Sequence, residues 1–137
     1  MNLRITLTIT ALLSILLSTF HLADDVVIGI EPGGTSNYIG ILIVAVYLYA
    51  TVMLGERRWA HVIVLIGSLG GAAVPYLHMT GVGLVGGKAT NYSGKFFWIW
   101  TLLALGATAI VSVVLSAQRL WNIQRGHYRV DAARSTR

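Results

Sequence analysis

Two histidines and a pair of aspartates are the residues of this chain whose types and spacing could support chemistry. His21 lies three and four residues before Asp24 and Asp25, so an imidazole and a carboxylate share one face if a helix continues through this segment. His78 ends another apolar stretch, which we expect to reach the same depth. Imidazole nitrogens and carboxylate oxygens are ligands for Zn²⁺, Cu²⁺ and Fe²⁺. The pattern predicts a site for a divalent transition metal formed by His21, Asp24, Asp25 and His78.

The two histidines also allow a second interpretation, in which His21 and His78 hold a haem b as its axial ligands. With either cofactor the protein would be an oxidoreductase or a metal-dependent hydrolase, although no residue is assigned a catalytic role. The alternative without chemistry is that each imidazole forms a hydrogen bond at the water boundary, while Asp24 and Asp25 end the helix. The chain has no HExxH motif, so spacing alone leaves these alternatives open.

The composition defines the class of protein that must position these residues. Of the 137 residues, 55% are hydrophobic and 11% are charged, against roughly 25% charged in a typical soluble domain. The chain has no cysteine, which excludes disulfides and thiolate metal sites. The net charge is +5, but nucleic-acid binders carry their charge on a hydrated surface that this chain lacks. An integral membrane protein without a nucleic-acid partner is expected.

Gaps between the charged residues divide the chain into four long apolar stretches: 5–23, 38–55, 59–79 and 96–118. A helix that rises 1.5 Å per residue needs about 20 residues to cross a hydrocarbon core of about 30 Å. The stretches are continuous rather than alternating, which excludes a barrel of short strands. The sequence predicts an all-α integral membrane protein whose four transmembrane helices form an antiparallel up-down bundle. This single domain spans residues 1–137 and includes a basic cytoplasmic tail at 119–137.

The first stretch has a rival interpretation as a secretory signal peptide, because Arg4 precedes a run of apolar residues. The run is longer than the roughly 7–15 residues of a signal-peptide core, and His21-Leu22-Ala23 is a poor cleavage site. We expect an uncleaved helix.

The positive charges predict the orientation of the four helices. With the N-terminus inside, only Lys88 and Lys95 of the ten Lys and Arg residues lie outside, which is the distribution of a protein with both termini in the cytoplasm. A multi-pass protein of a bacterial plasma (inner) membrane is expected. The tail is expected to lie along the anionic inner leaflet, because each basic residue there contributes about 1 kcal/mol. The residues expected to anchor the protein to this leaflet are Arg57, Arg58, Arg119, Arg125 and Arg129.

Tryptophan and tyrosine residues fit the same orientation. Trp59 and Trp121 fall at the inner boundary, whereas Tyr38, Tyr76, Trp98 and Trp100 fall near the outer one. Amphipathic rings favour the headgroup region, so these side chains are expected to face lipid headgroups.

Small residues in the third stretch predict close helix packing and a hinge. Gly67 and Gly71 form a G-x-x-x-G pattern, which lets helices approach closely. Gly70 and Gly71 directly precede the turn weakened by Pro75, which cannot donate a backbone hydrogen bond. Similar stripes of serine and threonine on the first and fourth stretches are expected to face neighbouring helices.

No charged residue falls at mid-membrane depth, which argues against a self-contained ion-coupled transporter. The leading hypothesis is a non-enzymatic accessory or assembly subunit, or a homo-oligomer, whose partners are other membrane subunits or further copies of itself. Metal or haem binding at the outer rim is the alternative. A passive pore lined by serine, threonine and glycine is a third hypothesis.

Overall fold

The computed structural model describes residues 3–31, 33–53, 57–80 and 87–135, with side chains described no further than residue 126. Within these ranges the chain forms four α-helices and one short 3₁₀ helix, and no strand. The elements are α1 (Leu3–Val27), α2 (Ser36–Met53), α3 (Arg58–Thr80), η1 (Lys88–Asn91) and α4 (Lys95–Ser135). The predicted all-α class is confirmed.

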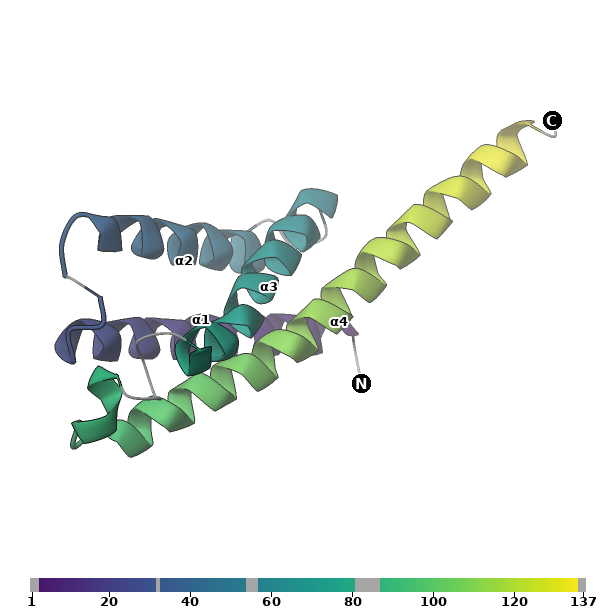
Figure 1. Cartoon of the computed structure of the whole chain (residues 1–137). Helices are drawn as coiled ribbons and strands as arrows, with labels where there is room; N and C mark the ends of the chain where they lie inside the picture. The colour runs from purple at the N-terminus through teal and green to yellow at the C-terminus, as the bar shows by residue number, and fades with distance from the viewer. Residues whose placement is uncertain (1–2, 32, 54–56, 81–86, 136–137) are drawn as a thin grey trace.

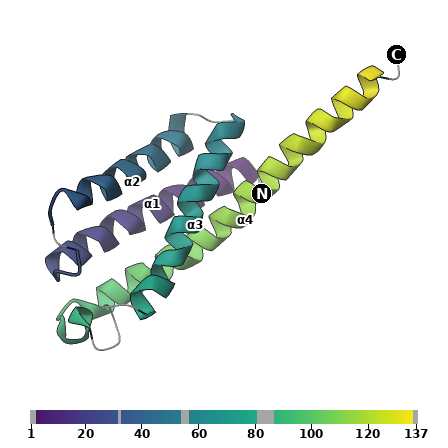
Figure 2. The ribbon, with the colours of Figure 1, turned by 45° about the horizontal axis from the view of Figure 1, so that its top comes forward.

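Successive helices alternate in direction, as Figures 1 and 2 show. α4 packs against both α1 and α3, whereas α2 packs against α1 and α3, and its backbone does not come close to that of α4 in the described part of the chain. The ends of α1 and α3 meet the beginning of α4 at one end of the molecule, which we call the histidine end (Figure 1). At the opposite end, α4 continues well beyond the other helices (Figure 2).

Three helices are long and apolar enough to cross a membrane: Leu3–Val27, Arg58–Met79 and Lys95–Gly126. α2 is also apolar but shorter. Its 18 residues rise about 27 Å, slightly less than the thickness of a hydrocarbon core of about 30 Å. The structure therefore supports a membrane protein, and the fourth crossing stays a prediction.

The helices extend further than the predicted spans at two places. α1 continues through Asp24 and Asp25 to Val27, so the aspartates do not end it. α4 runs through the tail to Ser135 without a break, whereas the tail was expected to lie along a leaflet. The tail contains helix-forming residues and no proline, which is why the helix of the preceding span can continue through it.

The interior combines apolar packing with a layer of hydroxyl groups. One apolar cluster includes Leu7, Ile15 and Val64, and another at the histidine end includes Trp98 and Leu102. Between them, hydroxyl groups from all four helices come together. The Tyr47 hydroxyl of α2 bonds to Ser68 of α3 at 2.8 Å, and Ser14 of α1 donates to Thr108 of α4 at 3.0 Å. Such bonds tie helices together where apolar packing alone gives little direction.

Glycines permit the close approaches around α3. A Cβ at Gly67 would lie 2.9 Å from the Tyr47 ring, and one at Gly71 would lie 3.2 Å from Ala109. A Cβ at Gly70, in contrast, would meet nothing within 4 Å. α3 remains helical through Pro75, whose ring packs on Gly106, where a Cβ would come within 2.7 Å. A hinge at Pro75 stays a prediction.

Candidate metal centre

Three of the four predicted ligands meet at the histidine end. His21 and Asp25 lie one turn apart on α1, and His78 lies in the last turn of α3. One ligand atom from each of these three residues lies within 4.8 Å of the others. The histidine rings touch edge to face, with their centroids 4.9 Å apart. Two residues of α1 and one that lies at least 53 positions further along the chain therefore form one cluster, which we call the His-Asp-His cluster.

Two of the donor separations in this cluster are close to those that a small metal ion requires. Oδ2 of Asp25 lies 3.0 Å from Nε2 of His78 and 3.7 Å from Nε2 of His21. Two ligands bound to Zn²⁺ at 2.0–2.1 Å in tetrahedral geometry are about 3.3 Å apart. The observed distances fall on either side of that value, so small side-chain shifts would complete the coordination.

The surroundings of His21 leave its Nε2 as the candidate metal-binding nitrogen. The Thr101 hydroxyl donates its only proton to the carbonyl of Trp98 at 3.0 Å. Its oxygen therefore accepts from Nδ1–H of His21, 3.2 Å away. Nε2 then carries a lone pair in the neutral ring. This nitrogen is buried and has no hydrogen-bond partner within the described residues, and the whole side chain is only 2% exposed.

His78 lies between two hydrogen-bond acceptors, one on its own helix and one on α1. Its Nδ1 lies 3.0 Å from the carbonyl oxygen of Val74, and its Nε2 lies 3.0 Å from Oδ2 of Asp25. The doubly protonated ring donates to both oxygens, whereas the neutral ring with its hydrogen on Nδ1 turns the Nε2 lone pair towards the carboxylate. Two electron-rich atoms at this distance repel each other unless a proton or a metal ion lies between them. Backbone or carboxylate contacts to the second ring nitrogen are typical of metal-bound histidines.

Trp98 of α4 orients the carboxylate of the cluster. Its indole Nε1–H donates to Oδ1 of Asp25 at 2.7 Å, which leaves Oδ2 directed at the two imidazoles. The Trp98 ring also packs against both of them, with centroids 5.2 Å from His21 and 5.6 Å from His78. All three candidate ligands thus have a partner that positions them.

Asp24, the fourth predicted ligand, lies apart from the cluster. It is one residue along the helix from Asp25, so its side chain points about 100° away. Its Oδ1 accepts a hydrogen bond from the Tyr92 hydroxyl at 2.8 Å. This contact raises the pKa of the Tyr92 phenol above its usual value, because the carboxylate accepts only from the neutral form. Asp24 therefore connects α1 to the segment before α4.

The ring contact argues against haem b. Axial ligation would place the iron and two iron–nitrogen bonds between the imidazoles, with the macrocycle in a slot between the helices. Here the rings of His21 and His78 are in contact, and Trp98 packs on both.

Sequence reasoning missed the two α4 residues that orient the cluster. Trp98 was predicted among lipid headgroups, but it is completely buried and bonded to Asp25. The other five aromatic residues predicted at the boundaries are exposed: Tyr38, Trp59, Tyr76, Trp100 and Trp121. Thr101 was noted only as part of a packing stripe. Because Thr101 lies 80 residues from His21 in sequence, no local spacing indicates this contact.

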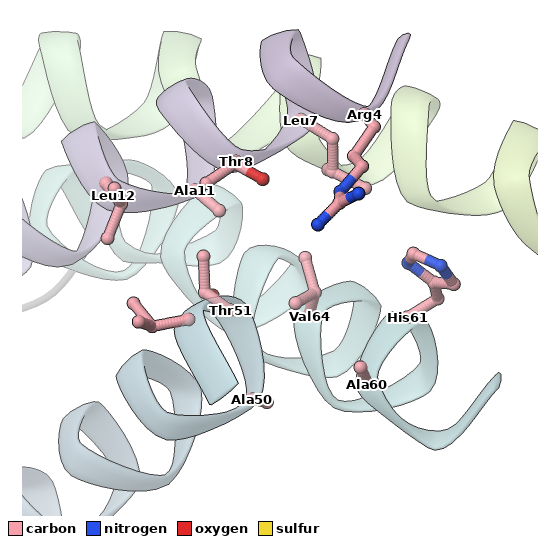
Figure 3. A pocket seen from close by; sticks show the side chains of 11 residues that line it. Arg4, Leu7, Thr8, Ala11, Leu12, Ala50, Thr51, Ala60, His61 and Val64 are labelled. Carbon is pink, nitrogen blue, oxygen red and sulfur yellow. The ribbon is translucent and has the colours of Figure 1, made fainter. Parts of the chain in front are cut away.

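The predicted lipid anchors lie at the end opposite the cluster. Arg57, Arg58 and Arg125 are exposed, and Arg119 is partly buried. The Arg125 guanidinium lies over the Trp121 ring, 4.7 Å from its centroid. Arg129 lies beyond the described side chains. The same end contains a pocket of about 230 Å³ between α1, α2 and α3, into which the Arg4 side chain points (Figure 3).

Comparison with known protein families, curated proteins and solved structures finds no match to this chain.

Proposed function

We propose that this protein is a multi-pass membrane protein that binds one divalent transition-metal ion through His21, Asp25 and His78. One observation carries the proposal: Nε2 of each imidazole and Oδ2 of the carboxylate converge, and the second polar atom of every ligand already has a partner. When both rings are neutral with their hydrogens on Nδ1, three electron-rich atoms face one another, and a metal ion would supply the positive charge that stabilises them.

The ligand set indicates which ions fit. Two imidazoles and one carboxylate bind Zn²⁺ in catalytic sites and Fe²⁺ in non-haem sites. Three protein ligands leave at least one position free, whereas structural zinc sites use four. The ion would therefore exchange water or take an oxygen atom from a ligand. A metal-dependent hydrolase or oxidoreductase is consistent with such an open position.

Metal analysis of purified protein tests the proposal. The protein is stripped with a chelator, dialysed against Zn²⁺ or Co²⁺, and analysed for bound metal. We expect one ion per chain and a visible Co²⁺ spectrum of low coordination number. Metal binding should also stabilise the fold, by about 2.7 kcal/mol when the free metal concentration is 100 times Kd. This stabilisation should appear as a higher unfolding temperature.

Three variants and one control make this test specific. His21→Ala, His78→Ala and Asp25→Asn should each abolish stoichiometric binding. His61→Ala removes a buried histidine from the opposite end of the molecule and should keep the ion. Bound metal that is unchanged in His78→Ala and Asp25→Asn would disprove the site. Circular dichroism of each variant establishes that it has folded.

The proposal includes four crossings with both termini in the cytoplasm of a bacterial plasma membrane. Support comes from the alternating helix directions and the excess of basic residues at one end. Because the chain has no cysteine, single cysteines report topology cleanly. Thr35→Cys and Ser93→Cys should react with an impermeant maleimide in intact cells, and Arg57→Cys should not. If all three cysteines were labelled, residues 35, 57 and 93 would lie on the same side, and neither α2 nor α3 would cross the membrane.

The other hypotheses stay predictions. An accessory subunit or homo-oligomer is compatible with a metal site, and native mass measurement in detergent tests it. A pore through one chain would have to displace Trp98, Leu102 and Leu105 from the interior, where each is at most 2% exposed.

A further inference from the structure

A large apolar groove begins one helical turn from the His-Asp-His cluster. Its volume is about 650 Å³, and it lies between α2 and α3, with Ser18 of α1 contributing to its wall. The α2 side includes Leu42 and Val46, and the α3 side includes Ile66, Gly70 and Val74. Leu42, Val46 and Ile66 are 46–64% exposed, so the groove opens sideways, towards the hydrocarbon of a membrane.

The groove and the cluster share the same helix faces. Val74 precedes His78 by four residues, about 6 Å along α3, and accepts the hydrogen bond from its Nδ1. Ser18 precedes His21 by three residues, about 4.5 Å along α1. Along α3 the groove extends inward from Val74 to Ile63, roughly 16 Å. An elongated apolar molecule in the groove would therefore have one end beside the proposed metal.

From this continuity we infer that the metal site takes a single-chain amphiphile with a carboxylate head, such as a long-chain fatty acid, whose chain lies in the groove. The inference rests on the proposed metal function. A divalent ion with two neutral imidazoles and the Asp25 carboxylate carries one net positive charge, which a monoanionic oxygen donor matches at the free position. Asp24 and Glu31 carry negative charge near the cluster, which disfavours a dianionic head.

Gly70 provides a variant that blocks the groove without disturbing the fold. It lines the groove, and a Cβ there meets nothing within 4 Å, so Gly70→Leu fills space that the occupant needs. Gly67 and Gly71 are unsuitable because a Cβ at either position meets packed side chains at 2.9–3.3 Å. Ala73→Leu adds the same side chain at an exposed position of α3 outside the groove and serves as the control.

The test measures binding of a fluorescent polyene fatty acid to the full-length protein in detergent, with Zn²⁺ loaded or removed. Zn²⁺ should tighten binding of the acid about tenfold or more and leave binding of the alcohol of equal chain length unchanged. Gly70→Leu should keep one Zn²⁺ per chain and weaken binding of the acid about tenfold or more. Ala73→Leu should behave like the natural protein.

The outcomes separate this inference from the proposed function. Elemental analysis before the acid is added shows whether Zn²⁺ binds, so a chain without Zn²⁺ contradicts both proposals. Bound Zn²⁺ with no effect on acid affinity overturns only the amphiphile. Unchanged acid binding in Gly70→Leu also overturns the amphiphile. If the natural protein is a dimer that Gly70→Leu dissociates, the groove is instead assigned to a second copy of the chain.

Discussion

Nε2 of His78 faces Oδ2 of Asp25 at 3.0 Å, while Nδ1 of the same ring lies 3.0 Å from the carbonyl of Val74. A neutral imidazole can give its one hydrogen to only one of these oxygens. Both contacts are therefore hydrogen bonds at the same time only when the ring is doubly protonated, and a metal ion bound to Nε2 would take the place of the second proton. Protons and metal ions compete for the same place. Such competition between protons and metal ions is a property of a binding site, and a pair of side chains with only a structural role would not need it.

Replacing the residue that orients His21 should weaken metal binding without removing a ligand. Thr101→Val keeps the shape of the side chain but loses the acceptor for Nδ1–H of His21. Loss of such a supporting contact typically lowers metal affinity by about 10–100-fold. Competition with a chromophoric chelator measures this affinity. Thr19→Val makes the same change at an exposed threonine whose hydroxyl donates to the Ile15 carbonyl of α1. The metal affinity of this control variant should be unchanged. Equal affinities for both variants would contradict the role of Thr101.

Trp98→Phe should destabilise the fold by removing the indole donor to Asp25. Hydrogen bonds to charged groups contribute about 1.5–3 kcal/mol, and this one is buried at 2.7 Å. Denaturant unfolding in detergent measures the loss. In an Asp25→Asn background the same substitution should cost less, because the acceptor is no longer a charged group. Trp100→Phe, at a residue that is 60% exposed, should have little effect. A loss of equal size in both backgrounds would mean that the ring's packing, rather than its donor, is responsible.

Tyr47→Phe should reveal the strength of the hydroxyl layer. The substitution keeps the buried ring and removes the 2.8 Å hydrogen bond to Ser68. Interhelical bonds of this kind contribute about 0.6 kcal/mol on average and up to about 1.7 kcal/mol. A double-mutant cycle with Ser68→Ala isolates the pair. Tyr49→Phe, at an exposed residue of the same helix, should leave stability unchanged. Additive effects of Tyr47→Phe and Ser68→Ala would refute the coupling.

Two glycines one turn apart should respond oppositely to alanine. Gly67→Ala places a methyl group 2.9 Å from the Tyr47 ring, and overpacking of this kind typically costs about 1–3 kcal/mol. Gly70→Ala meets no atom within 4 Å and gains helix propensity of up to about 1 kcal/mol. Unfolding temperatures of the two variants test the contrast. Similar losses at both positions would show that α2 and α3 pack differently from this structure.

The contact between Tyr92 and Asp24 should be visible in a titration. The carboxylate raises the pKa of the phenol, so the stability that the neutral phenol contributes is present at ordinary pH and is lost as pH rises through that raised pKa. Tyrosinate absorbance, taken as the difference between the natural protein and Tyr92→Phe, isolates this residue. Asp24→Asn should return the pKa towards the usual value of about 10. An unchanged titration in Asp24→Asn would exclude the contact.

Local spacing was sufficient to predict the parts of the site that lie on one helix. The four-residue step from His21 to Asp25 brings both to one face, given that α1 continues past the aspartates. His78 was paired with them because its stretch ends at the same depth. Asp24 could not be separated from Asp25 in advance, because the choice depends on how α1 is rotated about its axis. That rotation is determined by packing against α3 and α4.

The contributions of α4 could not be predicted from the sequence. Trp98 and Thr101 reach the cluster across 73 and 80 residues, and a tryptophan near a predicted boundary is equally compatible with a headgroup position. The end of α4 could not be predicted either, because basic residues indicate which side of the membrane a segment lies on and do not indicate where a helix stops.

The uninterrupted course of α4 has a mechanical consequence. Lys95–Ser135 is one helix, so the residues that hold His21 and Asp25 belong to the same rod as those that emerge from the opposite end of the molecule. A helix without a proline kink bends only gently. A small rotation or slide that moves Trp98 relative to Asp25 must therefore be accompanied by a movement of the far end, about 60 Å away along the helix axis. A change at the His-Asp-His cluster is therefore geometrically linked to the orientation of the far end of α4.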